Sequence, residues 1–422
     1  MLNVASLAAT AAARFGPGFV RPIYTDYGFA NLPATIERIM SGQGRGGLPE
    51  AALGDLGAHH ETVVLVFVDA LGWRFFEPYA AEHPFLQRFV QQGVVSRLTT
   101  MFPSTTAAHV TLMHTGLTPG ASGVFEWFFY EPQCNRVIAP LLFSFAGDKQ
   151  RETLAEAGVA PASIFPTTTF YQRLASHGIA STIYQHTSYA HSSFSTTVCA
   201  GAKLIPFRTL SEALTILHLR LKKKRGPHYH MLYIDTADML AHSYSPEAPH
   251  VAAEIDTILT TLERWLHPAL SSLGRRVLLM LIADHGQIAV QPSKTLLLNR
   301  LVPSLVAATP LGSDGLPIAP SGSNRDLFLY INEDRRSGII EALRTALAGQ
   351  AEVYPTEELI NAGFFGPSSS PRFLSRVGNI VVLPHPNVSV WWEDKRFPLK
   401  FKGAHGGLSE AEALTQVAIL GY

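Results

Sequence analysis

The sequence TVVLVFVDALG, residues 62–72, decides the fold of this chain. Its first seven residues are apolar or β-branched and show no polar alternation, which is typical of a strand buried on both faces of a parallel sheet. The run then ends in Asp69 and, three residues later, in Gly72, a turn residue. A buried strand that ends in this way places the Asp69 carboxylate at the carboxyl edge of a sheet.

Three further stretches are also apolar runs that we expect to form buried strands. Residues 277–282 (VLLMLI) lead into ADHG, and residues 230–234 (HMLYI) lead into DTAD. Residues 180–184 (ASTIY) follow a helix-like stretch that closes at Gly178. Because ligands of open parallel sheets bind outside the carboxyl ends of the strands, the acidic residues after three of these four strands are candidate site residues.

Helical patterns lie between the strands. Leucines recur every three or four positions over residues 210–221, and the basic run KKKRGP at residues 222–227 then ends the helix. This run complements the dipole at the helix C-terminus, so we interpret it as a solvated helix end and not as a nucleic-acid site. Strands that alternate with helices predict an α/β fold, a three-layer αβα sandwich with a mostly parallel central sheet.

The composition of the sequence changes between residues 295 and 400. Glycine, proline and serine gather there in loops around an expected strand at residues 326–331 and an expected helix near residues 337–348. We therefore expect a core formed by residues 1–294 and 401–422, and a smaller α/β insertion or cap formed by residues 295–400.

Composition excludes several classes of protein. The 422 residues are 47% hydrophobic and 16% charged with zero formal net charge, which excludes intrinsic disorder and a protein held to nucleic acid or lipid by its overall charge. The two cysteines, Cys134 and Cys199, cannot form a disulfide framework. No stretch resembles a signal peptide or a transmembrane segment. We expect a cytoplasmic protein without nucleic-acid or membrane partners, whose oligomeric state the sequence does not set.

Carboxylates, imidazoles and a hydroxyl recur in short motifs along the chain. Asp238 and His242, four residues apart, can share one face of a helical turn. Each motif alone has an ordinary structural interpretation, such as a turn, a helix cap or a surface pair. Together they supply ligand types that zinc and similar metals prefer. The candidate residues are Asp69, Thr106, Asp238, His242, Asp284, His285 and His405.

The motifs and their order resemble the type I phosphodiesterase/nucleotide pyrophosphatase family of the alkaline phosphatase superfamily. The resemblance rests on Val68-Asp69, FPSTT at 102–106 running on to Thr115-Gly116, YIDTAD at 233–238 with His242, ADHG at 283–286 and GAHG at 403–406. It implies the alkaline phosphatase-like fold and a hydrolase of phosphoester or pyrophosphate bonds. The expected partner is a small phosphoester substrate, with a nucleotide as one candidate.

The resemblance also implies a two-metal site. One divalent ion would be held by Asp238, His242 and His405. The other would be held by Asp69, Asp284, His285 and the hydroxyl oxygen of Thr106. Zinc is the expected metal, with manganese and magnesium as alternatives.

The family's nucleophile stands three residues after the proline of its motif, which is Thr106 in this chain; Thr105 and then Ser104 are the fallbacks. A threonine hydroxyl is a poor nucleophile at neutral pH and needs a base or a metal. At a helix N-terminus, Thr106 would also place the attacked phosphoryl group against backbone N–H donors. The implied reaction passes through a phosphorylated threonine that water then hydrolyses.

One position departs from the family pattern. Trp127 stands where nucleotide pyrophosphatases carry an asparagine that contacts a phosphoryl oxygen, and His109 is a candidate to supply the missing contact. The aromatic residues within 123–130 favour core or cap packing over stacking on a nucleobase.

Other functions remain open at this point. A phosphomonoesterase or a phosphonate hydrolase would share the metal core, and a catalytically silent metal-binding module is the alternative of another class. A sulfatase is disfavoured, because neither cysteine lies in a C/S-x-P-x-R motif and no arginine follows Pro103 within its motif.

Overall fold

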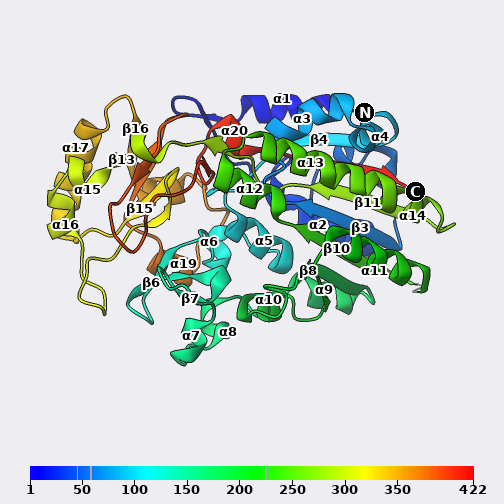
Figure 1. Ribbon diagram of the computed structural model, residues 1–422, viewed down its shortest axis with the longest axis horizontal. Helices are drawn as coiled ribbons and strands as arrows, with labels where there is room; N and C mark the ends of the chain where they lie inside the picture. The colour runs from blue at the N-terminus through cyan, green and yellow to red at the C-terminus, as the bar shows by residue number, and fades with distance from the viewer. Residues whose placement is uncertain (45, 58, 224–225) are drawn as a thin grey trace.

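A seven-stranded sheet forms the centre of the computed structural model, which describes residues 1–422 except 45, 58 and 224–225 (Figure 1). The order of its strands is β4-β20-β11-β3-β10-β8-β9. These strands are β3 (Thr62–Val68), β4 (Val94–Thr99), β8 (Ala180–His186), β9 (Lys203–Phe207), β10 (His228–Ile234), β11 (Val277–Ile282) and β20 (Leu414–Gly421).

The sheet is mostly parallel, as the sequence predicts. Strands β11, β3, β10, β8 and β9 pair in parallel, whereas β20 runs antiparallel between β11 and β4. In the register, Val68 of β3 pairs with Ile234 of β10, and Phe67 pairs with Ile282 of β11. The carboxyl ends of these three strands are therefore level, and the residues that follow them share one edge.

Helices cover both faces of the sheet. Every residue of β3 is buried, and since successive side chains of a strand point to opposite faces, both faces must be covered. Val63, Leu65 and Phe67 pack into one apolar cluster, and Val64, Val66 and Val68 pack into another. The first cluster contains residues of α2 (Leu32–Ser41), α5 (Thr106–Thr115), α9 (Phe170–Ser176) and α10 (Ser193–Val198). The second contains residues of α3 (Trp73–Glu82), α4 (Pro84–Gln92), α11 (Leu210–Lys223), α12 (Thr236–Tyr244) and α13 (Pro249–Thr261). The predicted three-layer sandwich is confirmed.

A second, antiparallel sheet has the order β14-β15-β17-β16. Its strands are β14 (Ser321–Ser323), β15 (Asp326–Leu329), β16 (Ala351–Pro355) and β17 (Ile380–Pro384), and α17 (Arg336–Ala346) shares its apolar cluster. Strand β15 and helix α17 correspond to the strand and helix predicted in this part of the chain. The division of the chain at residues 295 and 400 stays a prediction.

Buried ion pairs join the second sheet and nearby elements to the rest of the chain. Arg325, just before β15, donates from Nε and Nη2 to the Glu412 carboxylate at 3.0 and 2.9 Å, and neither side chain is exposed. Glu412 also accepts from the backbone N–H of Gly407 at 3.1 Å. Arg376 of α19 (Pro371–Arg376) similarly pairs with Glu131 of β5 (Phe129–Glu131). The Arg325–Glu412 pair therefore fixes the C-terminal loop that carries His405.

The exposure of the basic run supports its interpretation as a solvated helix end. Lys222 and Lys223 are exposed in the last turn of α11, whereas residues 224–225 of the run lie outside the described residues. Among the helices that the structure describes, none has both the length and the apolar composition that a membrane crossing requires.

The Arg325–Glu412 pair predicts a large stability effect. Replacing Arg325 by methionine leaves the buried Glu412 charge without its partner, so we expect Arg325→Met to lower the free energy of unfolding by about 3–5 kcal/mol in urea titrations. The matched control is Arg335→Met, because the Arg335–Asp334 pair is exposed and should contribute little. Equal losses in the two variants would contradict this role of the buried pair.

Candidate active site

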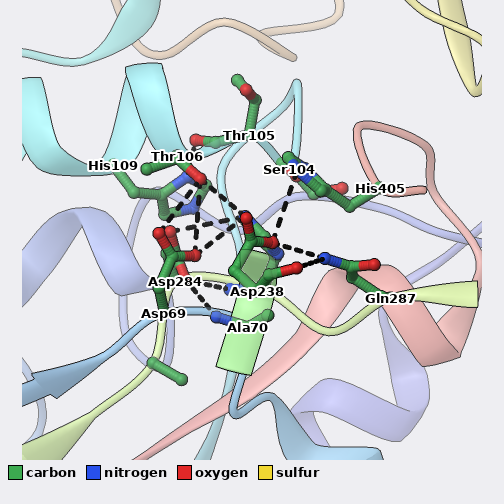
Figure 2. Close-up of polar contacts among 12 residues, drawn as sticks. Asp69, Ala70, Ser104, Thr105, Thr106, His109, Asp238, Asp284, Gln287 and His405 are labelled. Carbon is green, nitrogen blue, oxygen red and sulfur yellow. Dashed lines mark hydrogen bonds and ion pairs between the residues drawn. The ribbon is translucent and has the colours of Figure 1, made fainter. Parts of the chain in front are cut away.

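The seven predicted site residues meet at the carboxyl edge of the sheet. Figure 2 shows five of them, Asp69, Thr106, Asp238, Asp284 and His405. Asp69 follows β3, and Asp284 and His285 follow β11. Asp238 and His242 lie on α12, which follows β10. Thr106 is the first residue of α5, and His405 follows the short strand β19 (Gly403–Ala404). Segments that lie hundreds of residues apart in the sequence therefore contribute to one site.

Thr106 lies directly against the carboxylate of Asp69. Its Oγ1 is 3.4 and 3.5 Å from the two carboxylate oxygens of Asp69 and 3.1 Å from Nε2 of His285. The Thr106 residue is 8% exposed, so its hydroxyl is buried among acceptor groups with little access to water. This is the environment that a threonine needs if it is to act as a nucleophile.

The two fallback hydroxyls are placed differently. Ser104 Oγ donates to the carbonyl of Gly407 at 2.7 Å and accepts from Gly406 N at 3.1 Å, so it is used to join two loops. The Thr105 side chain points away from the carboxylates in Figure 2, and its carbonyl accepts from the backbone and the ring of His109. Of the three hydroxyls, Thr106 alone faces the cluster.

The first candidate metal-ligand group contains Asp238, His242 and His405, the set that the resemblance implies, and its possible ligand atoms lie within 4.8 Å of one another. Nε2 of His242 is 3.5 Å from Asp238 Oδ2, and Nε2 of His405 is 3.9 Å from Asp238 Oδ1. Each Nδ1 lies against a backbone carbonyl, Gly403 O at 2.8 Å and Ser104 O at 2.9 Å. An Nδ1–H donor at these positions leaves both Nε2 atoms as free acceptors that face Asp238.

The second group contains Asp69, Asp238 and His285, also within 4.8 Å of one another. The resemblance assigned Asp238 to one ion only, whereas the structure places it between both groups. Asp284 adjoins this second group, because its Oδ2 is 3.4 Å from Nε2 of His285. The rings of His285 and His405 stack with centroids 3.7 Å apart, which brings the two groups into contact.

Burial shifts the pKa values of these groups toward their neutral forms. Burial, reinforced by the charges of Asp284 and Asp238, raises the pKa of Asp69 well above its usual range. Burial also raises the pKa of Asp284 to about 7. The same cause lowers the pKa of His285 well below its ordinary value and lowers that of His405 to about 4. The site thus combines crowded carboxylates with neutral imidazoles.

This arrangement fits bound cations. Asp284 Oδ1 accepts from the backbone N–H groups of Ala70 and His285, but its buried Oδ2 has no hydrogen-bond partner among the described residues. An orphaned carboxylate oxygen is costly unless another group compensates it. Carboxylate oxygens together with imidazole nitrogens suit zinc, and the same oxygens also suit manganese and magnesium.

Two supporting residues were not identified from the sequence. Gln287 donates from its buried amide to both the side chain and the backbone carbonyl of Asp238. Tyr233 donates its hydroxyl to Asp69. Both side chains hold a candidate metal ligand in orientation, a role that depends on contacts between separate strands and helices. The only sequence signal for them is position: Gln287 directly follows ADHG, and Tyr233 is the first residue of YIDTAD.

His109 does not supply the missing asparagine contact. Its Nε2 accepts from Met101 N at 3.0 Å, and its Nδ1 lies 2.8 Å from the carbonyl of Thr105. The ring is fully buried, and burial lowers its pKa to about 3. Because both ring nitrogens are engaged inside the protein, His109 positions the loop that carries Thr106 and does not face the cleft.

The aromatic run divides into packed and exposed residues. Phe125 and Phe129 are fully buried and stack on each other with centroids 5.4 Å apart, which confirms the packing interpretation for these two. Trp127 instead is 36% exposed and lines a cleft beside Thr106. Other lining residues include Asp69, Tyr189, Tyr233, Asp235 and Asp238. A small molecule that occupies this cleft would contact both the aromatic side chains and the end that holds Thr106 and Asp69.

Comparisons with known proteins agree with this geometry. The family model described as type I phosphodiesterase/nucleotide pyrophosphatase matches residues 63–408. The fold is similar to that of murine ectonucleotide pyrophosphatase/phosphodiesterase 5 in an inactive form in complex with AMP, with a TM-score of 0.63, 16% identity, and coverage of 85% of this chain and 87% of that chain. The human protein of the same name gives a TM-score of 0.62 with the same identity and coverage. No curated protein sequence matches the chain.

The raised pKa of Asp284 predicts a pH-dependent stability in protein treated with a chelator. The pKa of Asp284 is about 7 in the folded chain but about 3.9 in an unfolded one. Between these values the folded state binds the extra proton, so this contribution to stability is present at low pH and is lost as the pH rises through 7. Asp284→Asn should therefore raise the free energy of unfolding by roughly 1–3 kcal/mol at pH 8.5 and by about half as much at pH 5.5.

Urea unfolding in EDTA measures this difference. Asp256→Asn is the control, because Asp256 is an exposed residue of α13. The same change in stability for Asp284→Asn at both pH values would show that the buried carboxyl does not titrate in this range.

Proposed function

This chain belongs to the type I phosphodiesterase/nucleotide pyrophosphatase family, and we propose that it uses Thr106 and two divalent ions to hydrolyse phosphodiester or pyrophosphate bonds. Family membership makes the chain a hydrolase that acts on phosphoester bonds. The observation that carries the proposal is the position of the Thr106 hydroxyl, which is 3.1 Å from His285 Nε2 and 3.4 Å from the Asp69 carboxylate.

The surroundings of Thr106 prepare it for attack. Its hydroxyl hydrogen lies among acceptor atoms of Asp69 and His285, so an oxygen lone pair is left for the substrate. The side chain of Thr105, the N-cap residue of α5, makes no capping hydrogen bond among the described residues. The N–H groups of the first turn are therefore available to phosphoryl oxygens, and the helix dipole favours the negative charge there.

Two divalent ions complete the proposed site. Asp238, His242 and His405 would hold one ion, and Asp69, Asp284, His285 and the Thr106 hydroxyl would hold the other. Bound ions would lower the pKa of the hydroxyl and neutralise charge on the phosphoryl group. The orphaned Oδ2 of Asp284 and the free Nε2 atoms of the histidines support this assignment, and the mixed nitrogen and oxygen ligands favour zinc, with manganese or magnesium as alternatives.

The reaction would proceed in two steps. Thr106 Oγ1 forms a bond to phosphorus while the bond from phosphorus to the leaving oxygen breaks, and the hydroxyl proton leaves through the acceptors around Oγ1. The product of this step is a phosphorylated threonine and a free alcohol or phosphate leaving group. Water then attacks the same phosphorus, which restores the threonine hydroxyl and releases a phosphomonoester.

A structural relative supports a threonine nucleophile and a nucleotide substrate. The inactive murine protein carries alanine in place of a threonine, and it is in complex with AMP. We accordingly propose a nucleotide phosphodiester as the first substrate to test. Phosphomonoesters and phosphonates are the alternatives that the same assay should include.

The nucleophile assignment predicts a selective loss of activity. Thr106→Ala should lower kcat for bis(p-nitrophenyl) phosphate by at least about 1,000-fold, because no neighbouring hydroxyl can replace Oγ1. Zinc content should change little, since six other ligands remain. Thr106→Ser should retain part of the activity, and Thr105→Val is the matched control. Substantial turnover by Thr106→Ala together with an inactive Thr105→Val would move the nucleophile to Thr105.

The metal assignment predicts a change in stoichiometry. His405→Ala should reduce the zinc content of the purified protein and lower activity, because the ligand is 167 positions away from Asp238 in the sequence but adjacent in space. The control is His59→Ala, since His59 is exposed and precedes β3 at the opposite edge of the sheet. Elemental analysis would refute the assignment if both variants kept the zinc content of the wild type.

A further inference from the structure

The cleft beside Thr106 extends along the sheet edge away from the candidate metal ligands. Asp69 follows β3, Asp235 follows the neighbouring strand β10, and Gln185 lies near the end of β8, the strand after that. The register pairs Leu232 with Tyr184, so Gln185 is level with Tyr233 and points to the same face. Because adjacent strands are about 4.8 Å apart, Gln185 lies roughly 10 Å from β3 along the edge.

Gln185 is an unpartnered polar residue at this far end. It is 4% exposed and lines the cleft, and the buried Oε1 atom of its amide has no hydrogen-bond partner among the described residues. A buried amide oxygen without a hydrogen-bond partner is destabilising. The cost of burying Gln185 in this way would be removed by a ligand that occupies the cleft and forms hydrogen bonds with its amide.

Arg151 also lines the cleft, and among the described lining residues it is the only lysine or arginine. Within the described part of the chain its side chain forms no ion pair and no hydrogen bond. The loop around it is nevertheless fixed: the carbonyl of Gln150 accepts from Ser144 Oγ at 2.9 Å, and Glu152 N donates to Leu142 O at 3.0 Å. Its backbone is thus held in place while its charge is left free.

The neighbour Glu152 does not neutralise Arg151. The Glu152 carboxylate accepts from Ser193 N at 3.0 Å and from Ser193 Oγ at 2.5 Å, at the start of α10. These bonds bring the Arg151 loop to α10, whose Ser195 and preceding Ser192 also line the cleft. The Arg151 loop is therefore held beside α10, the helix that follows β8, the strand that carries Gln185.

We propose that this end of the cleft binds a second anionic group of the substrate, a carboxylate or a phosphate about 10 Å from the scissile phosphorus, through Arg151 and Gln185. The inference rests on the proposed function and adds a substrate class to it. A guanidinium binds either anion with two parallel hydrogen bonds, and an amide can donate to the same group. Trp127, Tyr189 and Phe194 line the cleft with these polar groups, so the part of the substrate that joins its two anions is apolar or planar.

A set of matched p-nitrophenyl phosphodiesters tests this class. All share the leaving group, and the retained chain has one length and ends in a carboxylate, a phosphate or a hydroxyl. The zinc-loaded wild type should show a kcat/KM at least about tenfold higher for the two anionic esters than for the hydroxyl ester. The ranking of the carboxylate and phosphate esters then identifies which anion the site prefers.

Substitutions assign the preference to Arg151. Arg151→Gln should remove it by raising KM for the anionic esters with kcat unchanged, whereas Arg151→Lys should keep part of it. Gln185→Leu should weaken the preference in the same direction. The matched control is Arg208→Gln, which removes one exposed positive charge at the same sheet edge from a residue outside the cleft lining. This control should behave as the wild type.

The outcomes separate this inference from the proposed function. Equal kcat/KM for all three esters in the wild type overturns the second anion site and leaves Thr106 as the nucleophile. A parallel fall in kcat for all three esters in Arg151→Gln also overturns it, because Arg151 would then act on the scissile group. Failure of the wild type to hydrolyse any ester overturns the proposed function itself, and the inference with it.

Discussion

The mutual repulsion of three carboxylates at one edge of the sheet is the constraint on which the site depends. Asp69 and Asp284 are almost fully buried, and Asp238 lies within ligand distance of Asp69 and His285. Burial raises the pKa values of Asp69 and Asp284, and repulsion from the neighbouring carboxylates, which is strong where water is excluded, raises them further. Only bound cations or protons relieve this repulsion, and the neutral imidazoles around the carboxylates favour cations.

The fold keeps these groups together by joining segments that are distant in the sequence. The parallel register of β3, β10 and β11 brings their ends level. Ser104 bonds to the loop after His405 through both its backbone and its hydroxyl, and the Arg325–Glu412 pair fixes that loop from the other side. The glycine at 406 is required there, because its φ is +116° and a Cβ would lie 2.3 Å from Asp326 Oδ1. The position of His405 is therefore set by packing as well as by the motif.

The sequence predicts the central strands well because their burial is complete. The uninterrupted apolar runs of β3 and β11 have the same bounds in the sequence and in the structure. The antiparallel placement of β20 between β11 and β4 was not predicted, since no local pattern says which strand a C-terminal segment will join. The motif residues were found because their types and order carry chemical meaning.

Residues that act through tertiary contacts were less accessible to sequence reasoning. Nothing in the spacing of Gln287, Gln185 or Arg151 distinguishes them from ordinary polar residues, and their roles follow only from the helices and strands packed around them. For His109, the sequence suggested a role in the site that the structure does not support. A histidine three residues after Thr106 was a reasonable candidate for a substrate contact, but the helix turns it inward beneath the loop, where Met101 and Thr105 occupy both of its nitrogens.

An anomalous difference map, recorded at the zinc edge from crystals grown with zinc, tests the central claim most directly. The account predicts two peaks, one bounded by Asp238, His242 and His405 and the other by Asp69, Asp284, His285 and the Thr106 hydroxyl. A map without density at these positions, or with its peaks at other residues, would contradict a paired metal centre beside Thr106.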